Sequence, residues 1–364
     1  MKKILLSIFA IILGTCFVIG LDALVKLSRQ ENIEPEDEVI DTYNNYGLLY
    51  GMKPSNNILY SNNELVCYED RVVTFFDDKD ISYSHISNLC RRLKKATDNK
   101  AEVYFVPMPK RVIYEAGYEE DKEKYDNYIN KVNSTAGKHV NVIDLREQYD
   151  KLTDEFVFYR TEDTITAYGG VCAGQYIAEK IGMEPHNTDD YEVTLFNKYV
   201  GDCISLLGEY YDEKKISDSV YLSARNIDED PMYIYKYKGN EYSERLSEKD
   251  GYYERPAVLS SSPGKVAFVG GNFYHAVITG NSKAQKDGVL IICDSSGKMI
   301  APYLADYYKK VYVSNIARDD DLTVSSLQKI IRVYGIEEII WAQEAGNAGS
   351  EAYTNSLNYI GGAL

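Results

Sequence analysis

The chain has 364 residues, of which 45% are hydrophobic, and its formal net charge is −16. Nucleic-acid binding is not expected, because phosphate contacts need clustered Lys and Arg and no basic stripe is present. The apolar fraction is sufficient for one large core or two modest ones.

An apolar segment near the N-terminus has the length of a membrane-spanning helix. Lys2 and Lys3 precede an uncharged run over residues 4–21. About 20 apolar residues span a bilayer, and no Ala-x-Ala cleavage pattern follows, so the run is predicted to be an uncleaved signal anchor. With the two lysines inside, the rest of the chain is expected outside the cytoplasm. Cys16 weakly suggests a lipoprotein site instead, but Thr15 is unusual before a lipidated cysteine.

Three parts follow from this pattern. Residues 1–27 are predicted to form the anchor, a transmembrane helix that holds the protein at the cell membrane as a single-pass protein. Residues 28–45 are acidic and polar and suit a stalk, because such a composition buries little surface. Residues 46–364 are expected to form the extracytoplasmic domain, with an insert at about 209–254.

Five cysteines lie outside the anchor, at positions 67, 90, 172, 203 and 293. They are odd in number, widely spaced and without a C-x-x-C pair. Neither a disulfide framework nor a zinc site is indicated, although a single disulfide stays open. We expect no metal and no cofactor.

The first half of the domain alternates predicted strands and helices. Helices are expected over residues 81–96, 119–133 and 167–181, and strands over residues 101–107, 140–145 and 156–160. The β-α-β order favours a parallel sheet. The insert has a different character, because residues 233–242 alternate around Gly239-Asn240 and predict an antiparallel hairpin.

The last third contains the segment on which the functional hypothesis depends. Apolar residues 289–292 lead through Cys293 into Asp294, Ser295, Ser296 and Gly297, and predict a buried strand that ends in a tight turn. Helices at residues 302–310 and 322–334 and strands at residues 311–313 and 336–342 continue the alternation. Ser295 is thus expected at the carboxyl end of the sheet, where open α/β folds bind ligands. The alternative is an ordinary capped loop, because Asp and Ser are common in turns.

A second polar group lies at another junction between a strand and a helix. Glu162, Asp163 and Thr164 follow the strand predicted at residues 156–160 and precede the helix predicted at 167–181. Two acids there can orient a catalytic base. The alternative is an N-terminal cap, in which the carboxylates interact with the helix dipole.

Several sequence blocks resemble those of the DHHW-type proteins, relatives of the SGNH-hydrolase-like domains of alginate-type polysaccharide O-acetylation proteins. The Tyr-x-(Arg/Lys)-Thr-Asp-His-His-Trp-Thr block of the family corresponds to residues 158–166. The matching blocks occur in family order over some 300 residues, at 103–110, 140–145, 158–166, 167–182, 270–272 and 291–302. The resemblance implies an SGNH-hydrolase-like α/β fold, a parallel sheet flanked by helices, with the antiparallel hairpin as an insert.

The resemblance also implies a serine site, from which this chain departs. In active relatives the Asp and the second His of Asp-His-His-Trp complete a triad with the Ser of the later block. Glu162 and Thr164 occupy those positions here, and Ser295 is kept. A serine hydroxyl needs a base to act as a nucleophile, and loss of a triad member costs on the order of 10⁴-fold in rate.

Substitute groups are few. His275, after Gly271 and Asn272, is the only histidine near an expected block, and Glu162 or Asp163 would need a raised pKa to act as a base. The resemblance implies that Asp294 shapes the turn. Gly271 and Asn272 allow a close backbone approach to a ligand, or form only a turn.

Three hypotheses follow. The first is a degenerate, membrane-anchored relative of carbohydrate O-acetyltransferases that binds a cell-surface glycan or an envelope partner protein. The second is a working acetyltransferase or esterase that uses Ser295 with His275 or an acid. The third is a structural envelope protein without a small-molecule site.

Overall fold

The computed structural model describes most of the residues that the resemblance covers. The described ranges are 57–68, 71–98, 100–152, 157–186, 191–199, 201, 203, 218–225, 233–236, 252–254, 275–280, 283–315 and 324–350. The predicted anchor, the stalk, Gly271 and Asn272 lie outside these ranges.

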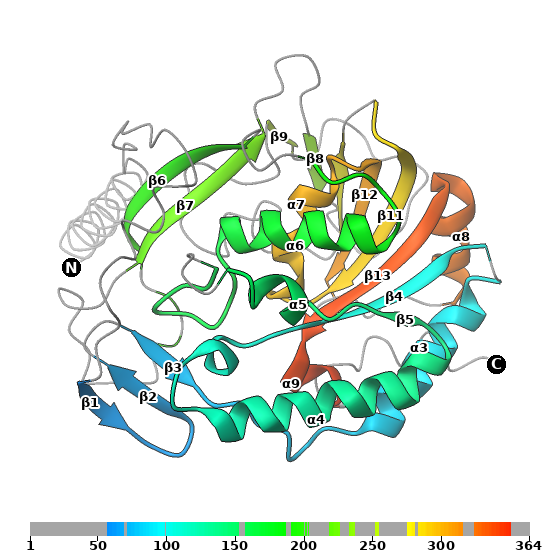
Figure 1. Cartoon of the computed structure of the whole chain (residues 1–364). Helices are drawn as coiled ribbons and strands as arrows, with labels where there is room; N and C mark the ends of the chain where they lie inside the picture. Colours follow the sequence, from blue (N-terminus) through cyan, green and yellow to red (C-terminus); the bar gives the residue numbers. More distant parts are fainter. Residues whose placement is uncertain are drawn as a thin grey trace, which may run out of the picture. The chain divides into compact units, whose positions relative to one another are not determined.

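A sheet of eight strands forms the centre of the domain (Figure 1). Its order is β5 (Asn141–Val142), β4 (Glu102–Met108), β13 (Ile336–Glu344), β11 (Lys286–Cys293), β12 (Tyr308–Asn315), β10 (His275–Thr279), β8 (Tyr233–Lys236) and β9 (Tyr252–Glu254). The first five strands pair in parallel, whereas β10, β8 and β9 join through antiparallel pairs. The structure therefore confirms a mixed α/β fold with a mostly parallel sheet.

Helices cover both faces of the sheet. On one face α5 (Arg146–Tyr149), α6 (Ala167–Lys180) and α7 (Ala301–Leu304) pack on one core cluster, and on the other face α3 (Tyr83–Ala96), α4 (Glu119–Thr135) and α8 (Val324–Tyr334) pack on a second. Alternate residues of β11 belong to alternate clusters, Ile291 to the first and Ile292 to the second. Both faces of a parallel strand are buried in this way, which explains the continuous apolar run.

Two smaller sheets lie outside the central one. The first contains β1 (Ile58–Ser61), β2 (Leu65–Tyr68) and β3 (Val72–Thr74), and the second contains β6 (Tyr191–Tyr199) and β7 (Asp218–Arg225). Short helical turns complete the described elements: η2 (Arg111–Tyr114), η3 (Ala136–Lys138), η7 (Gly297–Ile300) and α9 (Ala345–Ala348).

The structure corrects three of the expected elements. Residues 157–160 contribute only an isolated bridge, between Phe158 and Ile165, instead of a strand. The helix expected at 302–310 is only α7, because β12 begins at Tyr308. In the insert, β8 pairs with β9 and with β10, so β8 and β9 extend the central sheet, whereas β7 of the insert pairs with β6.

Two further expectations concern the membrane and the thiols. Within the described ranges no helix is long and apolar enough to cross a bilayer. The apolar run at residues 4–21 lies outside these ranges. The five described cysteines are all buried and are free thiols, and four of them lie on four different elements.

Candidate functional site

Three neighbouring parallel strands of the central sheet end at one edge, and a polar residue lies at or just after the end of each. In the strand register Met108 of β4 pairs with Glu344 of β13, and Cys293 of β11 pairs with Ala342 of β13. Lys110 follows β4 by two residues, Glu344 ends β13, and Ser295 follows β11 by two residues. The carboxyl edge of a parallel sheet is the usual place for a ligand site.

The turn that carries Ser295 is held by the side chain of Asp294. Oδ1 of Asp294 accepts hydrogen bonds from the backbone N–H groups of Ser296 and Gly297, each over 2.9 Å. Its Oδ2 accepts a third from the N–H of Glu344 over 3.0 Å. Ser295 itself is exposed. Asp294 therefore shapes the turn and engages the N–H groups of Ser296 and Gly297.

Asp294 also has an altered proton affinity. Burial raises its pKa to about 6, and the negative charge of Glu344 adds to the rise. The three backbone hydrogen bonds act in the opposite direction, because they favour the charged form. Around neutral pH the carboxyl group is thus mostly ionised.

The residues that correspond to the Asp-His-His-Trp block form a compact loop before α6. The loop closes on itself through hydrogen bonds from Tyr159 N to Thr164 O (3.2 Å) and from Thr166 N to Val157 O (2.7 Å). Arg111, which follows β4, donates from Nη1 to the carbonyl of Tyr159 over 3.0 Å. The loop is thereby attached to the same sheet edge as Lys110.

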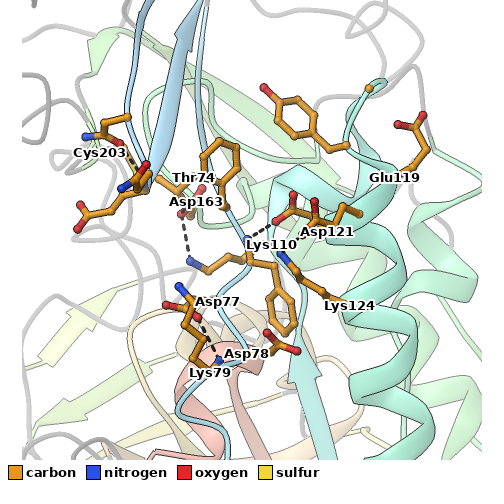
Figure 2. Close-up of a pocket in the computed structure, with 18 residues that line it drawn as sticks. Thr74, Asp77, Asp78, Lys79, Lys110, Glu119, Asp121, Lys124, Asp163 and Cys203 are labelled. Carbon is orange, nitrogen blue, oxygen red and sulfur yellow. Dashed lines mark hydrogen bonds and ion pairs between the residues drawn. The ribbon is translucent and has the colours of Figure 1, made fainter.

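Asp163 is the member of this loop that reaches the strand ends. Its Oδ2 accepts a hydrogen bond from the hydroxyl of Thr74 and lies 3.6 Å from Nζ of Lys110. The same Nζ lies 3.3 Å from Oε1 of Glu344. Figure 2 shows Lys110 extending toward Asp163, and both residues line a cleft. A continuous set of contacts therefore connects Asp163, Lys110, Glu344 and Asp294.

The charges of this set are strongly coupled. Burial raises the pKa of Asp163. The positive charge of Lys110 and the hydrogen bond from Thr74 partly offset this rise. Burial acts to lower the pKa of Lys110, but the carboxylates of Glu344 and Asp163 more than compensate and raise it. Lys110 consequently stays protonated and does not provide a base for Ser295.

The other two polar residues of the block are buried. Glu162 is 3% exposed and Thr164 is 6% exposed, and Gly201 packs directly against Glu162. The hydroxyl oxygen of Thr164 has no hydrogen-bond partner in the described part of the chain. Thr164 thus occupies a closed position, where its hydroxyl could not act as a base.

The histidines occupy different places. His85 lies on α3, and His139 follows η3 at the opposite edge, just before β5. His186 stacks on Tyr307 at a ring distance of 4.7 Å and bonds through Nε2 to the carbonyl of Asp306, before β12. None of these three belongs to the strand-end set.

His275 is placed by its backbone. It begins β10, where it pairs with Ser314 of β12, and Ser314 pairs with Ile292 of β11. His275 is therefore at the same sheet edge as Ser295, two strand spacings from β11, or about 10 Å. Of the predicted site residues, the structure brings Asp163 and Asp294 into one set of contacts and puts Ser295 and His275 on the same edge.

A cleft of about 1030 Å³ opens beside Asp163 and Lys110 (Figure 2). Its wall includes residues between β3 and α3 and the first turn of α4. Ser295 is not among the lining residues. The cleft therefore reaches Asp163 and Lys110 but does not include the serine.

Sequence reasoning missed Glu344 and gave Lys110 no role in the site. Both residues occur just after the end of a predicted strand. The same signal identified Ser295 and could have identified these two residues. Their convergence depends on β13 lying between β4 and β11. Residue patterns within each segment carry no information on that order.

Comparisons with known proteins agree on the fold. The structure is similar to that of a DHHW family protein from Eubacterium siraeum DSM 15702, with a TM-score of 0.69 and 17% identity over 85% of this chain and 99% of that one. It is also similar to Bacillus cereus PatB1 with a sulfonyl adduct (TM-score 0.57, 12% identity, 79% of this chain and 98% of that one). A second PatB1 structure gives a TM-score of 0.56 and 13% identity over 80% of this chain and 99% of that one.

The remaining comparisons found no match. No protein-family model matches the sequence. No curated protein matches it either. The structural neighbours confirm, at the level of the fold, the resemblance to DHHW-type proteins that the sequence blocks indicated.

Proposed function

We propose that this chain is a membrane-anchored, extracytoplasmic cell-envelope protein with an acyl-transferase-like fold that binds a glycan and has lost efficient ester chemistry. The observation that carries the proposal is the ion bridge of Lys110 between Asp163 and Glu344. It connects the block that supplies the base in active relatives to the end of β13, the strand next to β11. A protonated lysine in that place cannot accept the proton of a serine.

The nearby groups provide no substitute that is ready to act. Thr164 is buried, and one carboxylate oxygen of Asp163 is engaged by Thr74 and Lys110. Asp294 accepts hydrogen bonds from the backbone N–H groups of Ser296 and Gly297 in its own turn and of Glu344 at the end of β13. An active serine site needs both a base and a free oxyanion site. Thr164 and Lys110 supply no base, and the N–H groups of Ser296 and Gly297 are held by Asp294.

The cleft supports the binding part of the proposal. Its volume of about 1030 Å³ lies just above the roughly 300–1000 Å³ typical of ligand pockets. It adjoins Asp163, in the block that the resemblance assigns to the active site. A binding surface next to an inactivated centre is the arrangement expected of a degenerate enzyme that has kept its ligand.

Two measurements on the full chain in detergent test the proposal. An array of envelope glycans should show binding, and hydrolysis of an activated acetyl ester should be no faster for the wild type than for Ser295→Ala. Serine-dependent turnover at the rate of a working esterase would contradict the loss of catalysis. An array without any bound glycan would leave an envelope partner protein as the ligand and would contradict glycan binding.

A second candidate is a working esterase or acetyltransferase that uses Ser295 and His275. The observation that favours it is the strand register, which puts both residues on one edge with only β12 between their strands. Exposure of Ser295 is also compatible with it. This hypothesis requires that Ser295→Ala and His275→Ala each abolish turnover.

Membrane topology is tested separately. Protease added to intact cells should digest the domain, because the flanking Lys2 and Lys3 hold the anchor with its N-terminus inside. Full protection of the domain, with digestion only after lysis, would contradict the proposed orientation.

A further inference from the structure

The lining of the cleft beside Asp163 is unusually acidic. It contains seven carboxylate side chains and three lysines, so its formal charge is four units negative. Two of the lysines are paired, Lys110 with Asp163 and Glu344, and Lys124 with Glu120 over 2.8 Å. A polyanionic ligand would be repelled from such a cleft, and a cationic one attracted.

The carboxylates are too dispersed for a metal ion. No three His, Cys, Asp or Glu side chains converge on one point within the described residues. Asp77 and Asp78 lie on the segment between β3 and α3, whereas Glu119 begins α4 across the cleft (Figure 2). A ligand that satisfies them must carry several separated positive or hydrogen-bond-donating groups.

Aromatic rings add a second, independent feature to this lining. Phe75 and Tyr118 both line the cleft and are each partly exposed, with ring centroids 5.9 Å apart. They come from two different segments, after β3 and before α4. Partly exposed rings in a polar cleft provide apolar faces on which the C–H face of a sugar ring can pack.

The backbone of the cleft does not suit an extended peptide. Peptides that add to a sheet need a free strand edge with open N–H groups. Here the N–H of Phe75 donates to the carbonyl of Glu64, that of Phe76 to Asp121, and that of Lys79 to Asp77. Recognition therefore depends on carboxylates and rings, which favours a saccharide.

From these features we infer that the cleft binds an oligosaccharide with protonated amino groups, of the class of a glucosamine oligomer, and discriminates against uronate or phosphate-bearing glycans. The inference rests on the proposed function and specifies the ligand of the same site. Sugar rings pack on Phe75 and Tyr118, and the amino groups pair with Asp77, Asp78 and Glu119.

Calorimetry on the full chain in detergent, at pH 6 and low ionic strength, tests the inference with four probes. These are a β-1,4-linked glucosamine hexamer, its fully N-acetylated form, an oligogalacturonate and hexalysine. The glucosamine hexamer should bind about tenfold or more tightly than the acetylated hexamer, and added salt should reduce the difference. Oligogalacturonate should bind least.

Matched variants connect binding to the lining. Asp77→Asn/Asp78→Asn should weaken binding of the glucosamine hexamer by roughly three- to tenfold, since exposed charge pairs each contribute little. Glu119→Gln should weaken it by a smaller factor, whereas Glu123→Gln, one turn further along α4 and outside the lining, should not. Phe75→Leu should weaken binding of both hexamers. Thermal unfolding would establish that each variant is folded.

The possible outcomes separate the inference from the proposed function. Equal affinity for both hexamers, with no effect of Asp77→Asn/Asp78→Asn, would overturn the charge selection while glycan binding stands. Preferred binding of oligogalacturonate would do the same. Binding of hexalysine without either hexamer would identify a basic peptide as the ligand and would overturn glycan binding as well.

Discussion

The backbone N–H of Glu344 donates a hydrogen bond of 3.0 Å to Oδ2 of Asp294, across the ends of β13 and β11. The bond holds two carboxylates near each other at the sheet edge. The negative charge of the Glu344 side chain consequently contributes to the raised pKa of Asp294. Lys110 compensates the charge of Glu344 on the other side, at 3.3 Å. Stability and any chemistry at this edge are therefore sensitive to single charge changes.

Asp294→Asn should change the pH dependence of stability. The folded state binds the Asp294 proton with a pKa of about 6, against 3.8 in the unfolded chain, so this group reduces stability as the pH rises through that window. The Asn variant has no carboxyl group at this position, so its stability does not fall with pH for this reason. It is less stable than the wild type at low pH because it loses the hydrogen bond from the N–H of Glu344. The stability advantage of the wild type should shrink by up to about 2 kcal/mol between pH 4.5 and 7.

Urea unfolding at both pH values measures this difference. Asp287→Asn, in an exposed ion pair with Lys309, is the control. A wild-type advantage that is independent of pH, or that grows with pH, would show that Asp294 is not the titrating group.

Lys110→Met should destabilise the domain by about 2–4 kcal/mol, because it leaves Asp163 and Glu344 largely buried without their shared cation. Lys309→Met is the matched control, since its ion pair with Asp287 is about half exposed and should contribute under about 1 kcal/mol. Chemical denaturation at neutral pH measures both. The addition of Asp163→Asn to Lys110→Met should recover part of the loss, and a failure to do so would contradict the proposed coupling.

Gly297→Ala should disturb the turn that carries Ser295. A Cβ atom at Gly297 would lie 2.0 Å from the carbonyl oxygen of Ala342, so the turn must move away from β13. We expect a loss of roughly 1–3 kcal/mol. Gly137→Ala is the control, because its Cβ would meet no atom closer than 4.0 Å. Equal stability of the two variants would mean that the turn is not tightly packed.

Thr164→His tests whether one missing imidazole explains the loss of chemistry. A positioned general base contributes roughly 10²- to 10⁴-fold, and we expect the low end because Thr164 is only 6% exposed. Hydrolysis of an activated acetyl ester is the readout. Ser295→Ala in the same background should remove the gain, and a gain that survives it would place the chemistry elsewhere.

Local periodicity was sufficient to predict much of the fold. The helices expected at 81–96, 119–133 and 167–181 match α3, α4 and α6 within two residues, since each has an apolar face or stripe that packs on the sheet. The strand at residues 289–293 and its Asp-Ser turn were also predicted, because a buried parallel strand is apolar throughout.

Other parts depended on contacts that no local pattern encodes. The aromatic residues at 158 and 159 predicted a strand, but they fill the core while their loop bonds to itself. The approach of Asp163 to Glu344 requires a lysine from a third segment and a strand order in which β13 separates β4 from β11. The sequence could supply Ser295 as a candidate, but not the salt bridges that lie beside it.

The buried thiols have a consequence for measuring how the domain opens. Cys67 lies on β2, Cys90 on α3, Cys172 on α6 and Cys293 on β11, and each is shielded from solvent. Burial raises the pKa of the Cys90 and Cys293 thiols, which lowers their reactivity further while the fold is intact. A thiol reagent can therefore modify each position only when its element opens. The rate of modification at each cysteine, read by mass spectrometry, would give a native set of probes for local unfolding in four different elements of one chain.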